Sequence, residues 1–218
     1  MEKKYILTDE TIEYLGHTLH RIKAVKNFAT ISAGTLGGYV ESETNLDHTG
    51  AAWVYENAKV SGDAVVSGAA RVTDSALVTD SAWVTGAARV SGDARVTGDA
   101  RVTGAARVSG AAWVSGAALV SGAAVVSGAA LVTDSALVTD SARVSGDADF
   151  AVISGFGRVF RTTTFFRCKD NLVRCQCGCF YGSIEEFRAK VRETHGNSKY
   201  AKEYLMIADL MELHFKED

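Results

Sequence analysis

Proline is absent from this chain of 218 residues, and histidine is absent between His48 and His195. An average chain of this length contains about 5% proline. The sequence also lacks an apolar run near the roughly 18 residues that span a membrane, and its first residues lack the apolar core of a secretion signal. We therefore expect a cytoplasmic protein that does not enter a membrane.

Cysteine is scarce, and all four cysteines fall in the last third of the chain. In the cytoplasm, cysteines are expected as thiols or metal ligands and not as disulfides. Three of them alternate along one expected strand and the fourth lies on the strand before it, so a zinc site is one hypothesis. The spacing lacks the Cys-x-x-Cys step of common zinc sites and fits buried thiols better, so we expect no metal and no other cofactor. The four candidates are Cys168, Cys175, Cys177 and Cys179.

A repeat of six residues fills the middle of the chain. Valine occupies all sixteen positions from Val54 to Val144 in steps of six, and alanine occupies all seventeen from Ala52 to Ala148. In each Ala-x-Val triplet of an extended strand, alanine and valine point to one side and the middle residue to the other. Two residues after each valine, from residue 62 to 146, stands Gly or Asp, which tolerate positive φ. The repeat therefore predicts an interior of Ala and Val, outward middle residues, and a turn in every hexapeptide.

Strands of about three residues, each followed by a turn, bury a face only by coiling into stacked parallel rungs. The repeat has an aliphatic residue at one inward position and a small residue four places on, and it resembles the left-handed β-helix of the bacterial hexapeptide-repeat family. That resemblance implies three hexapeptides per turn and a trimer as the favoured assembly. We predict a mainly β fold, with a left-handed parallel β-helix over residues 46–160.

The residues before the repeat predict a cap. Residues 4–26 alternate around a Gly-His pair, which indicates a β-hairpin over the first rung, because an open end would expose unpaired backbone groups. Residues 24–46 resemble the N-terminal part of bacterial hexapeptide-repeat proteins that are often labelled acyltransferase-like. Val40 lies fourteen residues before Val54, which is not a multiple of six, so we expect the register to reset there. We assign residues 1–45 to the N-terminal cap.

The tail after the repeat predicts a small α+β module over residues 161–218. Residues 162–175 indicate a β-hairpin with a central turn. Ser183 and Glu186 form a capping-box pattern that begins a helix, and Ser198 can cap a second one. The second helix carries an apolar stripe that must be buried, formed by Tyr204, Ala208, Met211 and Phe215.

Outward positions eighteen residues apart should stack on one face of the coil. One face carries a row of arginines, which can bind the phosphates of a nucleotide or form surface ion pairs with nearby aspartates. The third face is largely apolar, and with Leu131 nearby it is predicted to contact another subunit. The first row is Trp53, Arg71, Arg89, Arg107, Val125 and Arg143, the second is Lys59, Leu77, Arg95, Trp113, Leu131 and Asp149, and the third is Val65, Trp83, Arg101, Leu119 and Leu137. The aspartates are Asp63, Asp93, Asp99 and Asp147, and the predicted interface residues are Trp83, Leu119, Leu131 and Leu137.

A second set of candidate ligand-binding residues lies near and within the tail. Its arginines and hydroxyls can donate hydrogen bonds to an anion held between subunits or caps. Residues 177–182 and 193–196 resemble the C-terminal module of uncharacterised proteins from phages and mobile elements, and that resemblance implies a role against host defences. The set is Arg158, Arg161, Thr163, Arg167 and Arg174.

An acyltransferase of the hexapeptide class needs a histidine base on the coil and usually a loop that interrupts the rungs, and this repeat supplies neither. We therefore expect no catalytic residue and a non-enzymatic, oligomeric binding protein. Its expected partner is a host protein or an anionic nucleotide-type ligand. Nucleic acid fits less well, because the net charge is −3 and the three tryptophans fall on different faces. Two alternatives stay open, an acyltransferase and a purely structural spacer.

Overall fold

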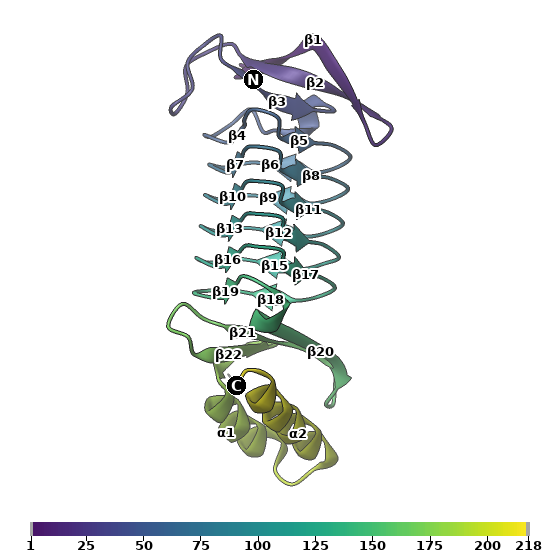
Figure 1. Ribbon diagram of the computed structural model, residues 1–218, viewed down its shortest axis with the longest axis vertical. Helices are drawn as coiled ribbons and strands as arrows, with labels where there is room; N and C mark the ends of the chain where they lie inside the picture. Colours follow the sequence, from purple (N-terminus) through teal and green to yellow (C-terminus); the bar gives the residue numbers. More distant parts are fainter. Residues whose placement is uncertain (1, 217–218) are drawn as a thin grey trace.

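The computed structural model describes residues 2–216, which form a long column with a cap at each end (Figure 1). The N-terminal cap contains β1 (Tyr5–Tyr14), β2 (His17–Ala24), β3 (Leu36–Val40) and the short 3-10 helix η1 (Glu43–Asn45). The column consists of two-residue strands: β4 (Trp53–Val54), β5 (Lys59–Val60), β6 (Val65–Val66), β7 (Arg71–Val72), β8 (Leu77–Val78), β9 (Trp83–Val84), β10 (Arg89–Val90), β11 (Arg95–Val96), β12 (Arg101–Val102), β13 (Arg107–Val108), β14 (Trp113–Val114), β15 (Leu119–Val120), β16 (Val125–Val126), β17 (Leu131–Val132), β18 (Leu137–Val138) and β19 (Arg143–Val144). The C-terminal cap contains η2 (Asp147–Asp149), β20 (Phe150–Phe156), β21 (Arg161–Arg167), β22 (Val173–Cys177), β23 (Phe180–Ser183), α1 (Ile184–His195) and α2 (Lys199–His214).

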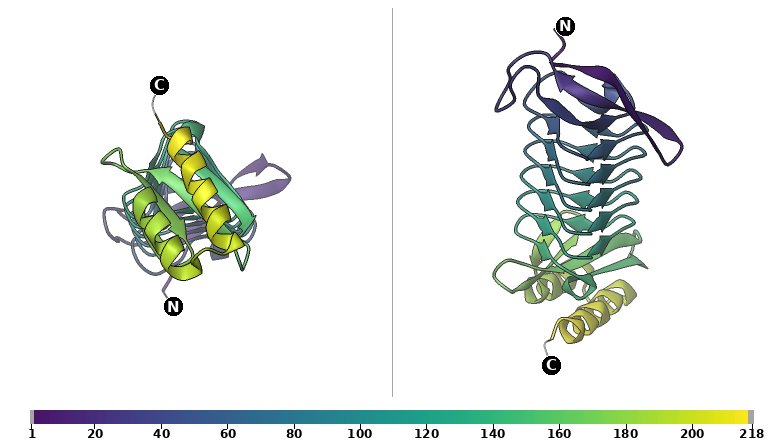
Figure 2. Two further views of the ribbon diagram at one scale, coloured as in Figure 1. Left: turned by 90° about the horizontal axis from the view of Figure 1, so that it is seen from below. Right: turned by 45° about the horizontal axis from the view of Figure 1, so that its top comes forward.

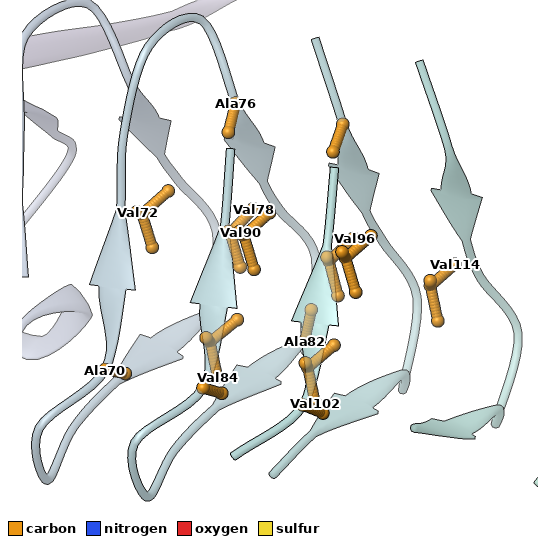
Figure 3. Packing of buried hydrophobic residues seen from close by; sticks show 14 of the residues in the cluster. Ala70, Val72, Ala76, Val78, Ala82, Val84, Val90, Val96, Val102 and Val114 are labelled. Atoms are coloured by element: carbon orange, nitrogen blue, oxygen red, sulfur yellow. The ribbon is translucent and has the colours of Figure 1, made fainter. Parts of the chain in front are cut away.

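The column is a β-solenoid of about six turns with three parallel sheets. Strands eighteen residues apart pair in register, as Trp53 with Arg71 and Val54 with Val72. The prediction from the Ala-x-Val triplet is confirmed, because the repeated alanines and valines from Ala52 to Val144 are at most 1% exposed. They fill one continuous core along the column (Figure 3). The outward rows follow the three sheets β4-β7-β10-β13-β16-β19, β5-β8-β11-β14-β17 and β6-β9-β12-β15-β18, as predicted.

Residues with positive φ form the turns of the column. Gly104 has a φ of 67°, and a Cβ on it would lie 3.0 Å from the backbone of Gly122 in the next rung. Aspartate adopts the same conformation at four turns. At one of them the carboxylate of Asp74 accepts a hydrogen bond from the backbone N–H of Gly92 at 2.8 Å. Gly146 departs from the predicted pattern, because its φ of −165° is extended and the chain enters η2 there.

The predicted N-terminal hairpin is confirmed, since β1 pairs antiparallel with β2, and β2 pairs with β3. β3 then joins the column, where Val40 pairs with Val60, a step of twenty residues rather than eighteen. This longer first rung accounts for the expected reset of the register. Lys4 closes the end of the column, because its Nζ donates to the carbonyl oxygen of Ala52 at 2.9 Å and of Thr49 at 3.3 Å.

The position of Trp53 in the repeat predicts that its side chain faces solvent. The side chain is instead 0% exposed. The N-terminal cap folds over it, with the ring of Phe28 at 5.4 Å and the ring of Tyr5 at 6.2 Å. The backbone passes so close that a Cβ on Gly37 would lie 2.7 Å from the indole. The prediction was wrong because the covering residues lie outside the repeat.

The C-terminal cap is a four-stranded antiparallel sheet, β20-β21-β22-β23, with α1 and α2 on one face. The predicted hairpin is confirmed as β21 and β22, and β20 belongs to the same sheet although it precedes residue 161. The opposite face covers the last rung, where Phe166 joins the solenoid core, whereas Phe165 packs under the helices. Ser183 and Ser198 cap the two helices as predicted, and the stripe predicted for the second helix is buried. No helix within residues 2–216 is long and apolar enough to cross a membrane.

Asp149 is not the next outward residue of the second face, because the chain leaves the repeat before reaching it. It lies in η2, and its Oδ2 accepts a hydrogen bond from the backbone N–H of Ser145 at 2.8 Å. Its Oδ1 lies 3.6 Å from Nε of Arg167 on β21. Asp149 therefore links the last rung to the sheet that covers it.

Candidate functional site

A pocket in the C-terminal cap brings together predicted and unpredicted residues. Its volume is about 390 Å³. Its walls are the loop between β20 and β21, the turn between β22 and β23, and one face of α1, and α2 contributes one tyrosine. The lining residues are Arg158, Val159, Arg161, Cys177, Cys179, Phe180, Phe187, Lys190, Val191, Thr194, His195 and Tyr204.

Two glycines let the walls of this pocket approach each other. Gly157 has a φ of 73° and Gly178 a φ of 61°, a conformation that residues with a Cβ rarely adopt. A Cβ on Gly157 would overlap the ring of Tyr204, and a Cβ on Gly178 would overlap the guanidinium of Arg161. The loop and the turn therefore approach these two side chains closely, with backbone conformations that favour glycine.

Aromatic rings form much of the pocket wall. The Oη of Tyr204 donates to the carbonyl oxygen of Phe156 at 3.3 Å. The ring of His195 stacks on the ring of Tyr204 at 5.8 Å with an angle of 28°, and Phe187 meets that ring edge-on at 5.7 Å. Burial, with the thiol of Cys177 adding to it, raises the pKa of Tyr204 to about 12. At neutral pH the phenol is therefore uncharged.

The charged side chains of the pocket are cationic. Arg158, Arg161 and Lys190 line it, and its lining residues include no Asp or Glu. Lys190 is paired with Glu193, at 3.0 Å. Neither arginine has an ion-pair partner within residues 2–216. The pocket thus combines apolar and aromatic walls with two uncompensated guanidinium groups, an arrangement that favours an anion.

The other three predicted tail residues do not line this pocket. Arg174 is held by Asp170 in a bidentate pair at 2.8 and 2.6 Å, and that pairing lowers the pKa of Asp170 to about 2. Arg167 donates to the carbonyl oxygen of Phe215 at 3.2 Å. Thr163 is 1% exposed, and its Oγ1 has no hydrogen-bond partner in the described part of the chain. The two arginines hold the cap together, Thr163 is buried within it, and none of the three is part of the candidate site.

That α1 lines the pocket was not predicted from the sequence. Its lining residues follow the spacing of one helix face, so the pattern contained a signal. The loop and the turn that complete the pocket are distant in sequence, and their approach to α1 could not be inferred. The residues concerned are Phe187, Lys190, Val191, Thr194 and His195.

The arginine row lies on the column and not near the pocket. Its first three members occupy successive rungs in register, and Val125 separates them from the fourth. Adjacent rungs are about 4.8 Å apart, so the three arginines follow one another along one face of the column. The alternative that these arginines pair with nearby aspartates is wrong for three of the four aspartates, because no ion pair joins them to the row within residues 2–216. The side chain of the fourth, Asp147, lies outside the described part of the chain. The row is Arg71, Arg89, Arg107 and Arg143, and the three aspartates are Asp63, Asp93 and Asp99.

The apolar third face is in the predicted place. Trp83 is 48% exposed, and the guanidinium of Arg101 lies 5.6 Å from its ring. Leu119 and Leu137 are partly buried, and the backbone N–H of Leu137 donates to the C-terminal sheet. Leu131 is 42% exposed on the second face. Contact between this surface and another subunit stays a prediction.

The four cysteines do not come together. Cys168 packs in the solenoid core, and Cys175 packs on the opposite face of the sheet, under the helices. Cys177 and Cys179 line the pocket. Cys168 lies two residues after Phe166 and, like it, faces the column, whereas Cys175 pairs with Phe165 and faces the helices. Within residues 2–216, no group of three or more His, Cys, Asp and Glu side chains is placed to hold a metal ion.

The fold defines this protein as a β-solenoid with a cap at each end and a pocket in the C-terminal cap. A protein-family model described as the YdcK beta solenoid repeat matches residues 88–104. The match covers a short part of the column and indicates similarity in the repeat, not in the pocket. No curated protein matches the chain.

Proposed function

We propose that this protein is a non-enzymatic binding protein and that its C-terminal pocket holds a small ligand with an anionic group and a flat apolar body. The observation that supports this proposal is the pairing of Arg158 and Arg161 with aromatic walls in one pocket that no carboxylate lines. The β-solenoid serves as a rigid support for that cap.

A nucleotide-type ligand fits this chemistry best. Two guanidinium groups can each donate two hydrogen bonds to a phosphate. The ring of His195 is partly exposed and stacks on the buried ring of Tyr204, so a base can extend this stack. A volume of about 390 Å³ lies within the range of sites for small organic ligands. Sequestration of a nucleotide signal would also account for the expected role against host defences.

Self-association through the third face belongs to the same proposal. A half-exposed tryptophan beside further apolar residues on a rigid column favours contact with a second copy, and a trimer is the assembly that the family resemblance implies. No particular observation favours acyl transfer, since β4 to β19 follow one another without an inserted loop.

Thermal shift measurements with cyclic dinucleotides, NAD-derived nucleotides and ATP test the proposal. We expect at least one nucleotide to raise the melting temperature of the wild-type protein, because a ligand that binds only the folded state stabilises it. Arg161→Gln should weaken the binding of that nucleotide roughly 10- to 100-fold, the loss expected for charge-assisted hydrogen bonds worth about 1.5–3 kcal/mol.

Arg95→Gln is the matched control, because it removes the same charge from an exposed position on the column, outside the arginine row. It should leave nucleotide affinity unchanged. The pocket proposal fails if no nucleotide in the panel binds, or if the two arginine variants weaken binding equally.

A further inference from the structure

Two of the four cysteines can react with a molecule from solvent, and both lie in the C-terminal cap, where α1 and α2 form the outermost layer of the molecule (Figure 2, left). Cys168 is 1% exposed and Cys175 is 0% exposed, whereas Cys177 is partly buried and Cys179 is exposed. Cys177 and Cys179 also line the same pocket. Thiol chemistry is therefore open to these two residues and closed to the other two.

A tight turn brings the two accessible cysteines together. Cys177 ends β22, Phe180 begins β23, and these two residues pair with each other. Gly178 and Cys179 alone therefore form the turn, and Gly178 has a φ of 61°. Two Cα–Cα steps of about 3.8 Å that bend sharply leave the Cα atoms of Cys177 and Cys179 about 5–6 Å apart. A disulfide joins Cα atoms that are about 4.4–6.8 Å apart, so the turn has the span that an S–S bond requires.

The surroundings of the turn favour thiol reactivity. Arg161 lies beside the residue between the two cysteines, because a Cβ on Gly178 would overlap its guanidinium. The thiolate is the form of cysteine that attacks a disulfide, and a neighbouring guanidinium stabilises it. Cys177 contributes to the raised pKa of Tyr204, so its thiol is a neighbour of that phenol. None of the residues that line the pocket is Asp or Glu, so no carboxylate of the lining opposes a thiolate there.

We propose that Cys177 and Cys179 form a reversible disulfide, a redox modification site in the wall of the pocket, and that a small-molecule disulfide such as glutathione disulfide is the oxidant. The exposed thiolate of Cys179 attacks the oxidant, so that a protein–glutathione S–S bond forms, the S–S bond of the oxidant breaks and one glutathione thiolate leaves. The thiolate of Cys177 then attacks the sulfur of Cys179, which closes the ring and releases the second glutathione. Two electrons pass from the protein to the oxidant, and the two glutathione thiolates take up the two protons that the cysteines lose.

The position of the pair predicts a labile bond. Exposed or strained disulfides are reduced more easily than buried structural ones, and a ring that contains a single residue between its cysteines leaves the turn little freedom. We therefore expect two thiols under reducing conditions and a disulfide only when the surroundings become oxidising. Because the turn lies against Arg161, closing the ring alters the wall of the pocket at that point.

Mass spectrometry of the full chain, after incubation with excess glutathione disulfide under native conditions, tests the proposal. The wild-type protein should lose the mass of two hydrogen atoms and carry no glutathione. Cys177→Ser removes the thiol that closes the ring, so this variant should instead keep one glutathione. Cys179→Ser, at an exposed position, should not lose the two hydrogens. Cys175→Ala is the matched control, because its thiol lies on the same strand but is buried, and it should behave like the wild-type protein.

Several outcomes overturn the proposal. An unchanged mass of the wild-type protein, a glutathione adduct that persists on it, or a covalent dimer shows that the ring does not close. Loss of two hydrogens from Cys177→Ser or Cys179→Ser shows that another pair of cysteines forms the bond. Excess reduced glutathione should restore the original mass, and a disulfide that it leaves intact contradicts the reversibility. No nucleotide takes part in these measurements, so this proposal and the proposed function can fail separately.

Discussion

The N-terminal cap buries a lysine, whose contribution to stability should increase as the solution becomes more alkaline. Lys4 is 1% exposed, and burial lowers its pKa from 10.5 to about 8, although Asp47 opposes that change. Between these two pH values, the unfolded chain keeps the proton on Lys4 and the folded chain has lost it. The unfolded state then binds more protons, so the free energy of unfolding increases with pH.

The size of this increase follows from the two pKa values. One pKa unit corresponds to 1.36 kcal/mol, so the full difference for Lys4 corresponds to about 3 kcal/mol. Other buried groups act in the opposite direction, because burial raises the pKa of Cys175, Tyr5 and Tyr204. Their unfolded forms ionise near pH 9 to 10 and the folded forms do not, which lowers stability there. A variant without Lys4 keeps all three groups, so from pH 8 to 10 we expect the wild-type protein to gain about 2 kcal/mol over such a variant.

Urea unfolding followed by circular dichroism at pH 7, 8, 9 and 10 measures this effect. Lys4→Met should lose this contribution, because the titrating group is gone, so the free energy of unfolding of the wild-type protein minus that of Lys4→Met should increase with pH. Lys26→Met is the matched control, since Lys26 lies in the same cap but at the surface, 3.1 Å from Glu2, and it should keep the wild-type slope. If the difference between the wild-type protein and Lys4→Met does not change from pH 8 to 10, or if Lys26→Met shows the same difference, the account of the buried lysine is refuted.

Two further predictions concern the column and its first rung. Gly104→Ala should lower the free energy of unfolding by about 1–2 kcal/mol, because it forces a residue with a Cβ into positive φ against the next rung. Gly146→Ala, at an extended position with open space, should change it by less than about 0.5 kcal/mol in the same urea titration. Trp53→Ala should lower the free energy of unfolding by about 3–5 kcal/mol, because it empties a fully buried site. Trp113→Ala, at a position that is 44% exposed, should cost less than about 1 kcal/mol, and equal losses for the two tryptophans would show that the cap does not cover Trp53.

The repeat made most of the column predictable. In a solenoid each rung contacts only its neighbours, so the surroundings of a residue follow from its position within the hexapeptide and from the residues eighteen places away. The rows that stack Arg71 on Arg89 and Trp83 on Arg101 could therefore be inferred without coordinates. The two helices of the tail were also predictable, since their capping serines act on the residues directly after them.

The candidate site was predictable only in part, because it depends on contacts between distant segments. Arg158 and Arg174 look alike in the sequence, but one lines the pocket and the other is held by Asp170. That difference depends on which side of a sheet each residue reaches and on what packs there. Nothing in the spacing of the chain contains that information.

By itself, the sequence determined the period of the fold, the inside and outside of each rung, and the existence of two caps. It could do so because hydrophobic alternation and turn residues act over a few positions. Only the tertiary structure decided that Trp53 is buried, that the cysteines are divided between two faces of a sheet, and that a loop, a turn and a helix enclose a cationic pocket. Each of these outcomes depends on a segment outside the repeat folding back onto it, and the free energy of such long-range packing is not encoded in any local pattern.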